Sequence, residues 1–200
     1  MKIPFSRKAW IFLGVVLVGT AVTMFVLPEE VLNERYKPPV QRGQPLFDQV
    51  GIFAFVGSFV ATVLFIPFDI FQLHLLRPPG IVISIFSLVL FAAGWTLITA
   101  AVRANAFAAP VVRHQEERGQ RVIDRGPYRF VRHPMYSAVI PLLVGMSLWL
   151  GSFAGAIVAI VPTVLIGIRA MLEEKFLRRE LPGYAEYMTR TRFRMIPYVW

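Results

Sequence analysis

The chain has 200 residues, of which 56% are hydrophobic and 16% are charged, and its mean hydropathy is +0.59. Soluble domains carry about 25% charged residues, so this composition excludes a soluble globular protein and indicates an integral membrane protein of one domain. The net charge of +9 is attributed to basic loops at a membrane rather than to nucleic acid binding, and the absence of cysteine excludes disulfides and thiolate chemistry.

Five apolar segments follow one another along the chain, and each predicts a membrane-spanning helix. The first and third contain 19 and 22 residues without a charge, close to the roughly 20 that cross a hydrocarbon core. The last two have 16 residues each and are separated only by Gly151 and Ser152, which predicts a tight helical hairpin. The segments are residues 9–27, 51–71, 81–102, 135–150 and 153–168.

The expected fold is therefore all-α: a single membrane domain of residues 1–200 with about five transmembrane helices. Five crossings would place four basic residues on one face and seventeen on the other, which predicts an outside N-terminus and a cytoplasmic C-terminus. Lys2, Arg7 and Lys8 before the first span oppose this orientation and suit a signal peptide. Cleavage of such a peptide would leave the seventeen charges outside, so five spans are expected.

An unusual polar stretch, "DRGPYRFVRHPMYSA" at residues 124–138, leads directly into the fourth apolar segment. Arginine, tyrosine and histidine are common where a helix leaves the headgroup region, and Pro134 suits the first turn of a helix. An "RHP" step alone is thus explained as an interfacial anchor. Tyr128, His133 and Tyr136 within nine residues indicate instead that this stretch contributes to a binding site.

A second polar stretch, "IRAMLEE", continues the fifth apolar segment. Arg169 and Glu173 are four residues apart and share a helix face, so an ordinary surface ion pair is one interpretation. Charged groups that emerge directly from a membrane usually need a partner or a ligand. The two polar stretches should lie on the same membrane face, where they would suit a ligand that carries both charges and meets a lipophilic substrate.

These stretches resemble the membrane methyltransferases typified by isoprenylcysteine carboxyl methyltransferase, to which phospholipid N-methyltransferases are related. The resemblance covers residues 105–198 and rests on "GQRVIDRGPYRFVRHPMY", "EEKFLRRELPGYAEY" and "FRMIP". It implies that residues 1–102 supply three spans and that residues 103–200 form a catalytic half with a cytoplasmic cofactor-binding region. The "LPGY" step is one residue shorter than the family pattern, which leaves the choice between Glu173 and Glu174 open.

The resemblance implies S-adenosylmethionine as methyl donor and assigns roles by position. Arg169 matches the arginine that holds a substrate carboxylate, and methyl transfer to a carboxylate needs no general base because that group is already ionised. One glutamate would bind the donor's ammonium and the tyrosines would supply ring faces. The implied donor contacts are Gln120, Arg121, Val122, Ile123, Tyr128, His133, Pro134, Met135, Tyr136 and Glu173 or Glu174.

The expected function is methyl transfer in the membrane to a lipophilic substrate, foremost the carboxylate of an isoprenylcysteine-like or isoprenoid acid. A phospholipid N-methyltransferase is one alternative. An NADPH-dependent reductase of the sterol type is a second, although the paired glutamates would repel the dinucleotide's phosphates. A non-enzymatic protein that binds anionic lipid is a third. No metal site is expected, because His74, His114 and His133 are scattered.

Overall fold

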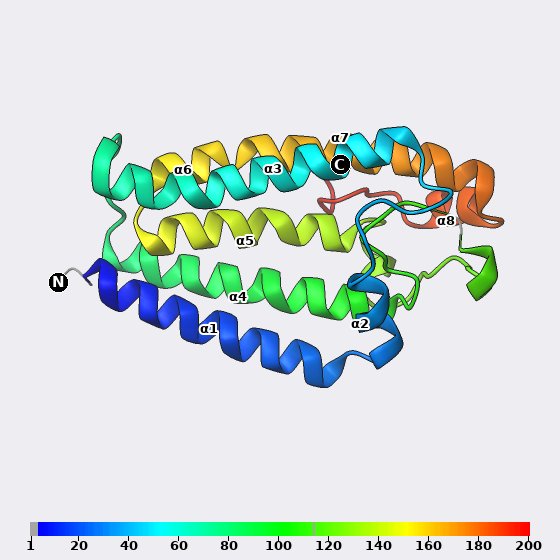
Figure 1. The fold of residues 1–200 in the computed structure, drawn as a ribbon, viewed down its shortest axis with the longest axis horizontal. Coiled ribbons are helices and arrows are strands. Elements are labelled where there is room, and N and C mark those ends of the chain that lie inside the picture. The colour runs from blue at the N-terminus through cyan, green and yellow to red at the C-terminus, as the bar shows by residue number, and fades with distance from the viewer. Residues whose placement is uncertain (1–3, 114) are drawn as a thin grey trace.

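The computed structural model describes residues 4–113 and 115–200, so Lys2 and His114 lie outside the described residues. Its helices run along one long axis with alternating direction (Figure 1). Two 3₁₀ turns, Glu116–Arg118 and Gly126–Arg129, lie in the connection before α5. The α-helices are α1 (Phe5–Val26), α2 (Glu29–Arg35), α3 (Leu46–Phe68), α4 (Ile81–Ala104), α5 (Pro134–Leu150), α6 (Phe153–Val158), α7 (Ile160–Glu180) and α8 (Tyr184–Arg190).

Four apolar stretches are long enough to cross a membrane, and α5 is a shorter apolar helix. The four are Phe5–Val26, Leu46–Leu73, Ile81–Ala104 and Phe153–Glu180. Together with α5 they form the all-helical membrane bundle that the sequence predicts. Two of them extend well into polar sequence: α3 begins at Leu46 and α7 ends at Glu180. Asp48 and Arg169, which lie in these extensions, pair with each other inside the protein.

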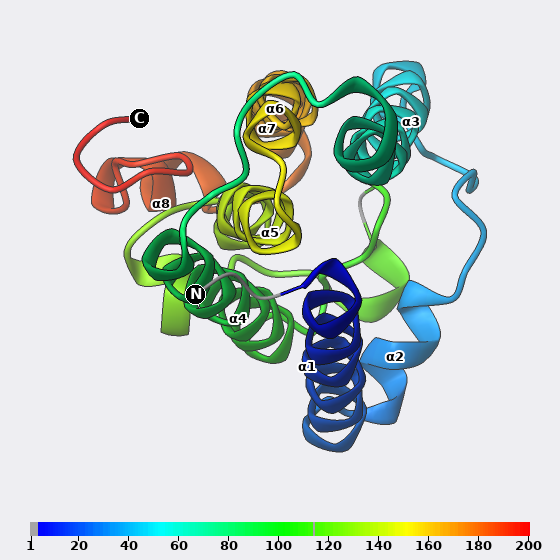
Figure 2. The same cartoon turned by 90° about the vertical axis from the view of Figure 1, so that its left-hand side faces the viewer.

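Helix α5 lies between α4 and the α6–α7 pair (Figure 2). Its buried side chains pack with α3, α4 and Ala159 in the main apolar cluster, which includes Ile66, Phe91 and Leu143. A helix of 17 residues is about 26 Å long, which is short for a span. Because other helices of the bundle cover α5, it does not need the full length of a helix that faces lipid.

Close approach of α4 and α5 depends on Gly145. A Cβ atom built there would lie 2.6 Å from both the Phe91 amide nitrogen and the Ser87 carbonyl oxygen. Small residues allow helix backbones to approach in this way in membranes. The turn after α5 also uses a glycine, since Gly151 has a φ of 119°, and Ser152 then caps α6 by accepting a hydrogen bond from the Gly155 amide. The predicted hairpin is thus present.

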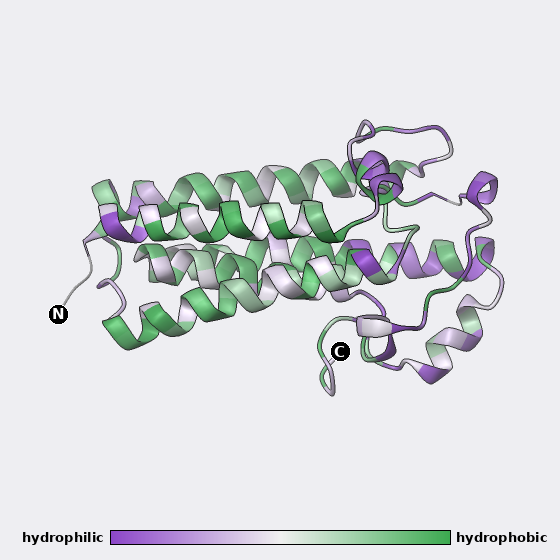
Figure 3. Ribbon diagram, turned by 90° about the horizontal axis from the view of Figure 1, so that it is seen from below, coloured by the Kyte–Doolittle hydropathy of each residue, from purple (hydrophilic) through white to green (hydrophobic). Residues whose placement is uncertain are grey.

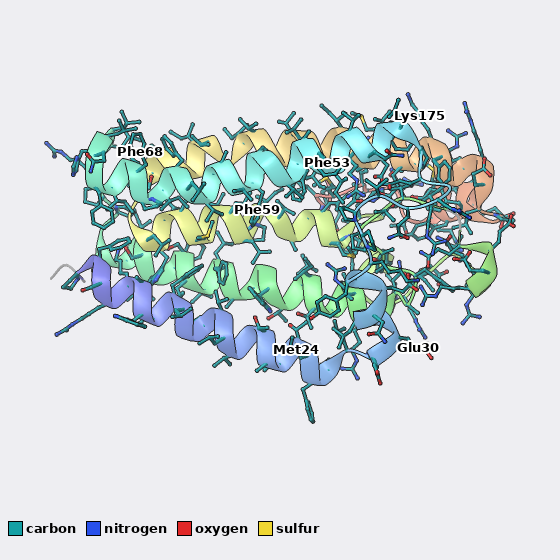
Figure 4. The ribbon with its side chains drawn as sticks, in the orientation of Figure 1. Met24, Glu30, Phe53, Phe59, Phe68 and Lys175 are labelled. Atoms are coloured by element: carbon teal, nitrogen blue, oxygen red, sulfur yellow. The ribbon has the colours of Figure 1, made fainter. Side chains whose placement is uncertain are left out.

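The two polar segments lie at one end of the bundle, together with α2 and α8 (Figure 1). Hydrophilic residues gather at that end, whereas the middle of the bundle is hydrophobic (Figure 3). Glu30 and Lys175 lie at this polar end, while Phe59 and Phe68 lie along the apolar length of α3 (Figure 4). The beginning of α1 and the connection between α3 and α4 lie at the opposite end. This arrangement positions the candidate site at one membrane face.

Candidate active site

A pocket at the polar end is enclosed by the segment that follows α4, the start of α5, and parts of α7 and α8. Most of the implied donor contacts meet in it, although they come from separate parts of the chain. Those that line it are Gln120, Arg121, Val122, Ile123, Tyr128, His133, Met135, Tyr136 and Glu173. Pro134 and Glu174 lie outside this lining, and so does Arg169.

His133 forms one wall of the pocket, and the backbone explains its position. It is the residue before α5, and Pro134 begins the helix as the sequence predicts. The His133 amide donates to the carbonyl of Arg194 at 2.8 Å, and the Arg132 amide donates to that of Phe193 at 2.9 Å. These two bonds hold the "FRMIP" segment against the "RHP" step, so His133 is buried rather than placed as an anchor in the headgroup region.

Glu174 is the centre of a buried charge cluster behind the pocket wall. Its Oε1 atom accepts from Arg132 Nε at 2.7 Å, and its Oε2 atom accepts from Arg194 Nε at 2.8 Å. The Nε2 atom of His133 lies 3.2 Å from Oε1. A buried carboxylate needs such partners to offset its lost hydration. Glu174 therefore joins the start of α5, α7 and the C-terminal segment.

Glu173, in contrast, faces the pocket. Its Oε2 atom accepts a hydrogen bond from the Tyr136 hydroxyl at 2.7 Å, and its side chain is 19% exposed. The Tyr136 ring stacks on the ring of His133, with centroids 5.3 Å apart and planes 5° apart. An acid and two stacked rings thus border the same space. Of the two glutamates that the sequence left open, Glu173 is the one whose carboxylate is available to a bound molecule.

Arg169 lies beside the pocket with its guanidinium committed to protein partners. It is 5% exposed, and its Nε atom donates to Asp48 Oδ1 at 2.7 Å. One terminal nitrogen donates to the Pro110 carbonyl at 2.7 Å, and the guanidinium lies 5.6 Å from the centre of the Tyr136 ring. Among the described residues its ion-pair partner is Asp48, on α3, rather than Glu173 one turn away.

Asp48 was not predicted to take part in the site. It is fully buried, and besides Arg169 it accepts from the Val112 amide at 2.8 Å and from Gln44 Nε2 at 2.7 Å. Val112 lines the pocket, so Asp48 ties the pocket wall to α3 and α7. The signal in the sequence is an acid in the first turn of an apolar helix, but nothing nearby in the chain identifies its partner.

Other lining residues were also missed. Tyr184 and Tyr187 belong to α8, and the Tyr187 hydroxyl donates to the Tyr128 carbonyl at 2.8 Å, which docks α8 against the pocket. Burial raises the pKa of Tyr128 to about 12 and also raises the pKa values of Tyr184 and Tyr187, so these phenols stay neutral at physiological pH. Further lining residues are Asn105, Phe107, Ala108, Ala109, Val111, Val112, Arg113, Gln115, Arg132, Leu177 and Leu181.

The segment from Asn105 to Gln120 holds its shape through its own polar side chains. The side-chain Nε2 of Gln115 donates to the Phe107 carbonyl at 2.9 Å, and the backbone amide of Gln115 donates to Gln120 Oε1 at 2.8 Å. Within the described residues no group of three histidine, cysteine, aspartate or glutamate side chains could hold a metal ion. Of the three histidines considered for such a site, His74 lies in the connection between α3 and α4, at the end of the bundle away from His133.

The described residues thus form a helical membrane bundle with a pocket at one end, bordered by charged, aromatic and apolar side chains. The chain belongs to the phospholipid methyltransferase family, whose pattern matches residues 82–182. That match covers α4 to α7 and half of the chain. No curated protein matches the chain. Family membership implies a membrane methyltransferase that acts on lipid-like substrates.

Proposed function

We propose that the protein transfers a methyl group from S-adenosylmethionine to a membrane lipid, with the donor bound in the pocket at the polar end. The observation that carries this proposal is the position of Glu173. Its carboxylate faces a space bordered by the stacked rings of His133 and Tyr136, and by residues 120–123 from a distant part of the chain. These are the residue types that a zwitterionic, aromatic donor requires.

The lining residues fit the donor group by group. When bound, S-adenosylmethionine supplies an electrophilic methyl on a sulfonium, together with an ammonium, a carboxylate and an adenine. Glu173 would accept hydrogen bonds from the ammonium, and exposed Arg121 would donate to the carboxylate. The rings of Tyr136 and Tyr128 would face the cationic and planar parts. Catalysis would come from aligning the donor with the acceptor and from excluding water.

For the acceptor we give preference to an amine in a phospholipid headgroup. A carboxylate acceptor would need a cation to hold it, and Arg169 is buried with Asp48 and the Pro110 carbonyl as partners. An amine needs no such cation. It does have to lose a proton before it can attack, since amines are protonated at neutral pH. The pocket wall contains an imidazole, that of His133, which can take up such a proton.

The carboxylate of an isoprenylcysteine-like or isoprenoid acid is the second candidate. Two observations support it: the resemblance in the C-terminal half, and the guanidinium of Arg169 against Tyr136, a residue of the pocket wall. A shift of that guanidinium toward the pocket would make it available to a substrate. Both candidates share the donor site, and they differ in the charge of the group that is methylated.

Donor titration by calorimetry tests the site on protein purified in detergent. Wild-type protein should bind S-adenosylmethionine or S-adenosylhomocysteine at one site. Glu173→Gln should weaken this binding by roughly 10- to 100-fold, because a charge-assisted contact is worth about 1.5–3 kcal/mol. Glu180→Gln is the matched control, since Glu180 is exposed on the same helix and outside the pocket. Saturable binding of NADPH instead of the donor would contradict the proposal.

Methyl transfer with a radiolabelled donor then identifies the acceptor. Vesicles that contain phosphatidylethanolamine are compared with vesicles that contain an isoprenylcysteine acid. Label in the first lipid alone supports the amine, and label in the second alone supports the carboxylate. Donor binding without labelling of either acceptor would show that the lipid class is wrong.

We further propose that the polar end lies in the cytoplasm and that the N-terminus lies outside. Seventeen of the 21 basic residues belong to the segments that meet at the polar end. Reporter fusions in the 103–132 connection and after Trp200 should both report cytoplasm. Reporters on opposite sides would show that α5 with α6 and α7 does not form two crossings. Residues 103–200 would be the catalytic half of one domain, because the pocket lining falls within it.

A further inference from the structure

A second, larger cavity lies beside the end of α4, and its lining residues differ from those of the donor pocket. It is a groove of about 1080 Å³ between α1 and α4, and its walls are mostly valine, alanine, glycine and threonine. It extends from Ile11 to Val26 of α1, about 22 Å of helix, which exceeds the roughly 15 Å depth of one bilayer leaflet. Since this length of α1 is apolar and spans the membrane, the groove opens into hydrocarbon.

Helix α1 leaves this groove unfilled because it packs loosely on the bundle. Lys8 is its only buried residue within the described part of the helix. Gly19 lets the ring of Trp95 approach, since a Cβ atom there would lie 2.9 Å from the ring. Gly14, further along the same wall, has no atom within 4 Å of a Cβ position. The seam between α1 and α4 is therefore closed near Trp95 and open beside Gly14.

The end of the groove nearest the polar face carries two arginines. Arg103 belongs to the last turn of α4, and Arg125 precedes the 3₁₀ turn that packs on that helix end. Both are exposed, and neither has an ion-pair partner among the described residues. The neighbouring carboxylate of Asp124 pairs with Arg190 at 3.1 Å, so it does not neutralise Arg125. Arg125 Nε donates to the Ala104 carbonyl at 3.3 Å, which holds the side chain at the mouth of the groove.

We propose that this groove is a binding site for an anionic phospholipid of the bilayer. The acyl chains lie along Gly14, Val18 and Val22, and the headgroup phosphate lies between Arg103 and Arg125. The occupant follows from charge complementarity: an apolar groove of leaflet depth ends at two arginines that have no ion-pair partner among the described residues, and this arrangement suits a lipid anion. The site is separate from the donor pocket, because the two cavities share no lining residue.

Native mass spectrometry of the detergent-purified protein tests this without any methyl donor. Wild-type protein titrated with phosphatidylglycerol should retain one molecule, in preference to phosphatidylcholine. The double substitution Arg103→Gln with Arg125→Gln should weaken retention roughly ten- to thirty-fold, since each basic residue near a membrane surface is worth about 1 kcal/mol. Arg178→Gln with Arg179→Gln is the charge-matched control, because these exposed arginines on α7 lie outside the groove.

A second pair of variants tests the apolar part of the site. Gly14→Leu places a side chain in the open groove and should displace the lipid chains, whereas Gly57→Leu on α3 enters equally open space outside the groove and should leave binding unchanged. Loss of phosphatidylglycerol from Gly14→Leu alone supports the site. Equal retention of both lipids by the wild type, or equal loss in the two arginine double variants, would overturn it.

Discussion

Arg169 Nε donates to Asp48 Oδ1 across 121 residues of sequence, at 2.7 Å and in a fully buried setting. This pair joins α3 to α7, and the same aspartate accepts a hydrogen bond from the Val112 amide in the wall of the candidate pocket. Arg169, for which the family resemblance implies a substrate role, thus has a structural partner, and no motif identifies that partner.

Substitution of Asp48 should be severe. Asp48→Asn leaves the Arg169 guanidinium buried without its ion-pair partner, and loss of one member of a buried pair costs about 3–5 kcal/mol. We expect a large drop in the thermal midpoint in detergent, together with weaker donor binding. Asp124→Asn is the control, because its pair with Arg190 is exposed and should contribute at most about 1 kcal/mol. Similar midpoints for the two variants would contradict the role of Asp48.

Arg169→Lys separates the structural role of this arginine from a substrate role. Lysine keeps the charge but loses the planar donor fork that reaches both Asp48 and the Pro110 carbonyl. A structural role predicts lower thermal stability and an equal fractional loss of turnover with amine and carboxylate acceptors. If turnover falls by one to two decades with the carboxylate acceptor alone, while stability is kept, Arg169 binds substrate and the carboxylate becomes the preferred acceptor.

The close contact of α4 and α5 gives a third prediction. Gly145→Ala puts a methyl group 2.6 Å from backbone atoms of Phe91 and Ser87, so the helices must separate, and overpacking of this kind typically costs about 1–3 kcal/mol. Gly57→Ala adds the same methyl in open space and should be neutral or slightly stabilising, because alanine favours helix over glycine. Thermal unfolding of both variants in detergent checks this, and equal midpoints would show that the helices do not rely on Gly145.

From the buried phenol of Tyr128 we expect the protein to lose stability in strongly alkaline solution. Its pKa in the folded protein is raised by burial to about 12, whereas a tyrosine in an unfolded chain titrates near 10.0. The unfolded chain therefore releases this proton first, so the stabilising contribution is complete below pH 10 and is lost as the pH rises toward 12. Unfolding midpoints measured from pH 9 to 12 should fall less steeply for Tyr128→Phe than for the wild type. Parallel curves would contradict the burial of this phenol.

The sequence predicts the bundle well because its apolar segments are long, and the composition of each segment by itself indicates a membrane-spanning helix. It also predicts much of the pocket wall, since Tyr128, His133 and Tyr136 are close in sequence and the helix start at Pro134 sets their geometry. Glu173 and Glu174 show where such reasoning stops. They are adjacent and chemically identical, and only the direction of the helix decides that one faces the pocket and the other faces Arg132 and Arg194.

Contacts between residues far apart in the chain could not be predicted from the sequence for a related reason. Asp48 and Arg169 each look like a charge at the edge of an apolar segment, and nothing in either segment identifies the other. The pocket wall between Asn105 and Gln115 carries no motif either, because much of it is held by bonds from side chains to backbone within the segment. Such contacts depend on tertiary geometry rather than on residue spacing.

Because residues 132–133 pair with residues 193–194, the pocket wall is completed late in the protein's biosynthesis. Residues 193–194 follow all five apolar helices in the chain, so the ribosome makes them after the residues of those helices. Until then the Glu174 cluster lacks Arg194 and the wall beside His133 lacks its backbone partners. The pocket wall beside His133 is therefore completed only when the C-terminal segment has been made and has docked against the start of α5.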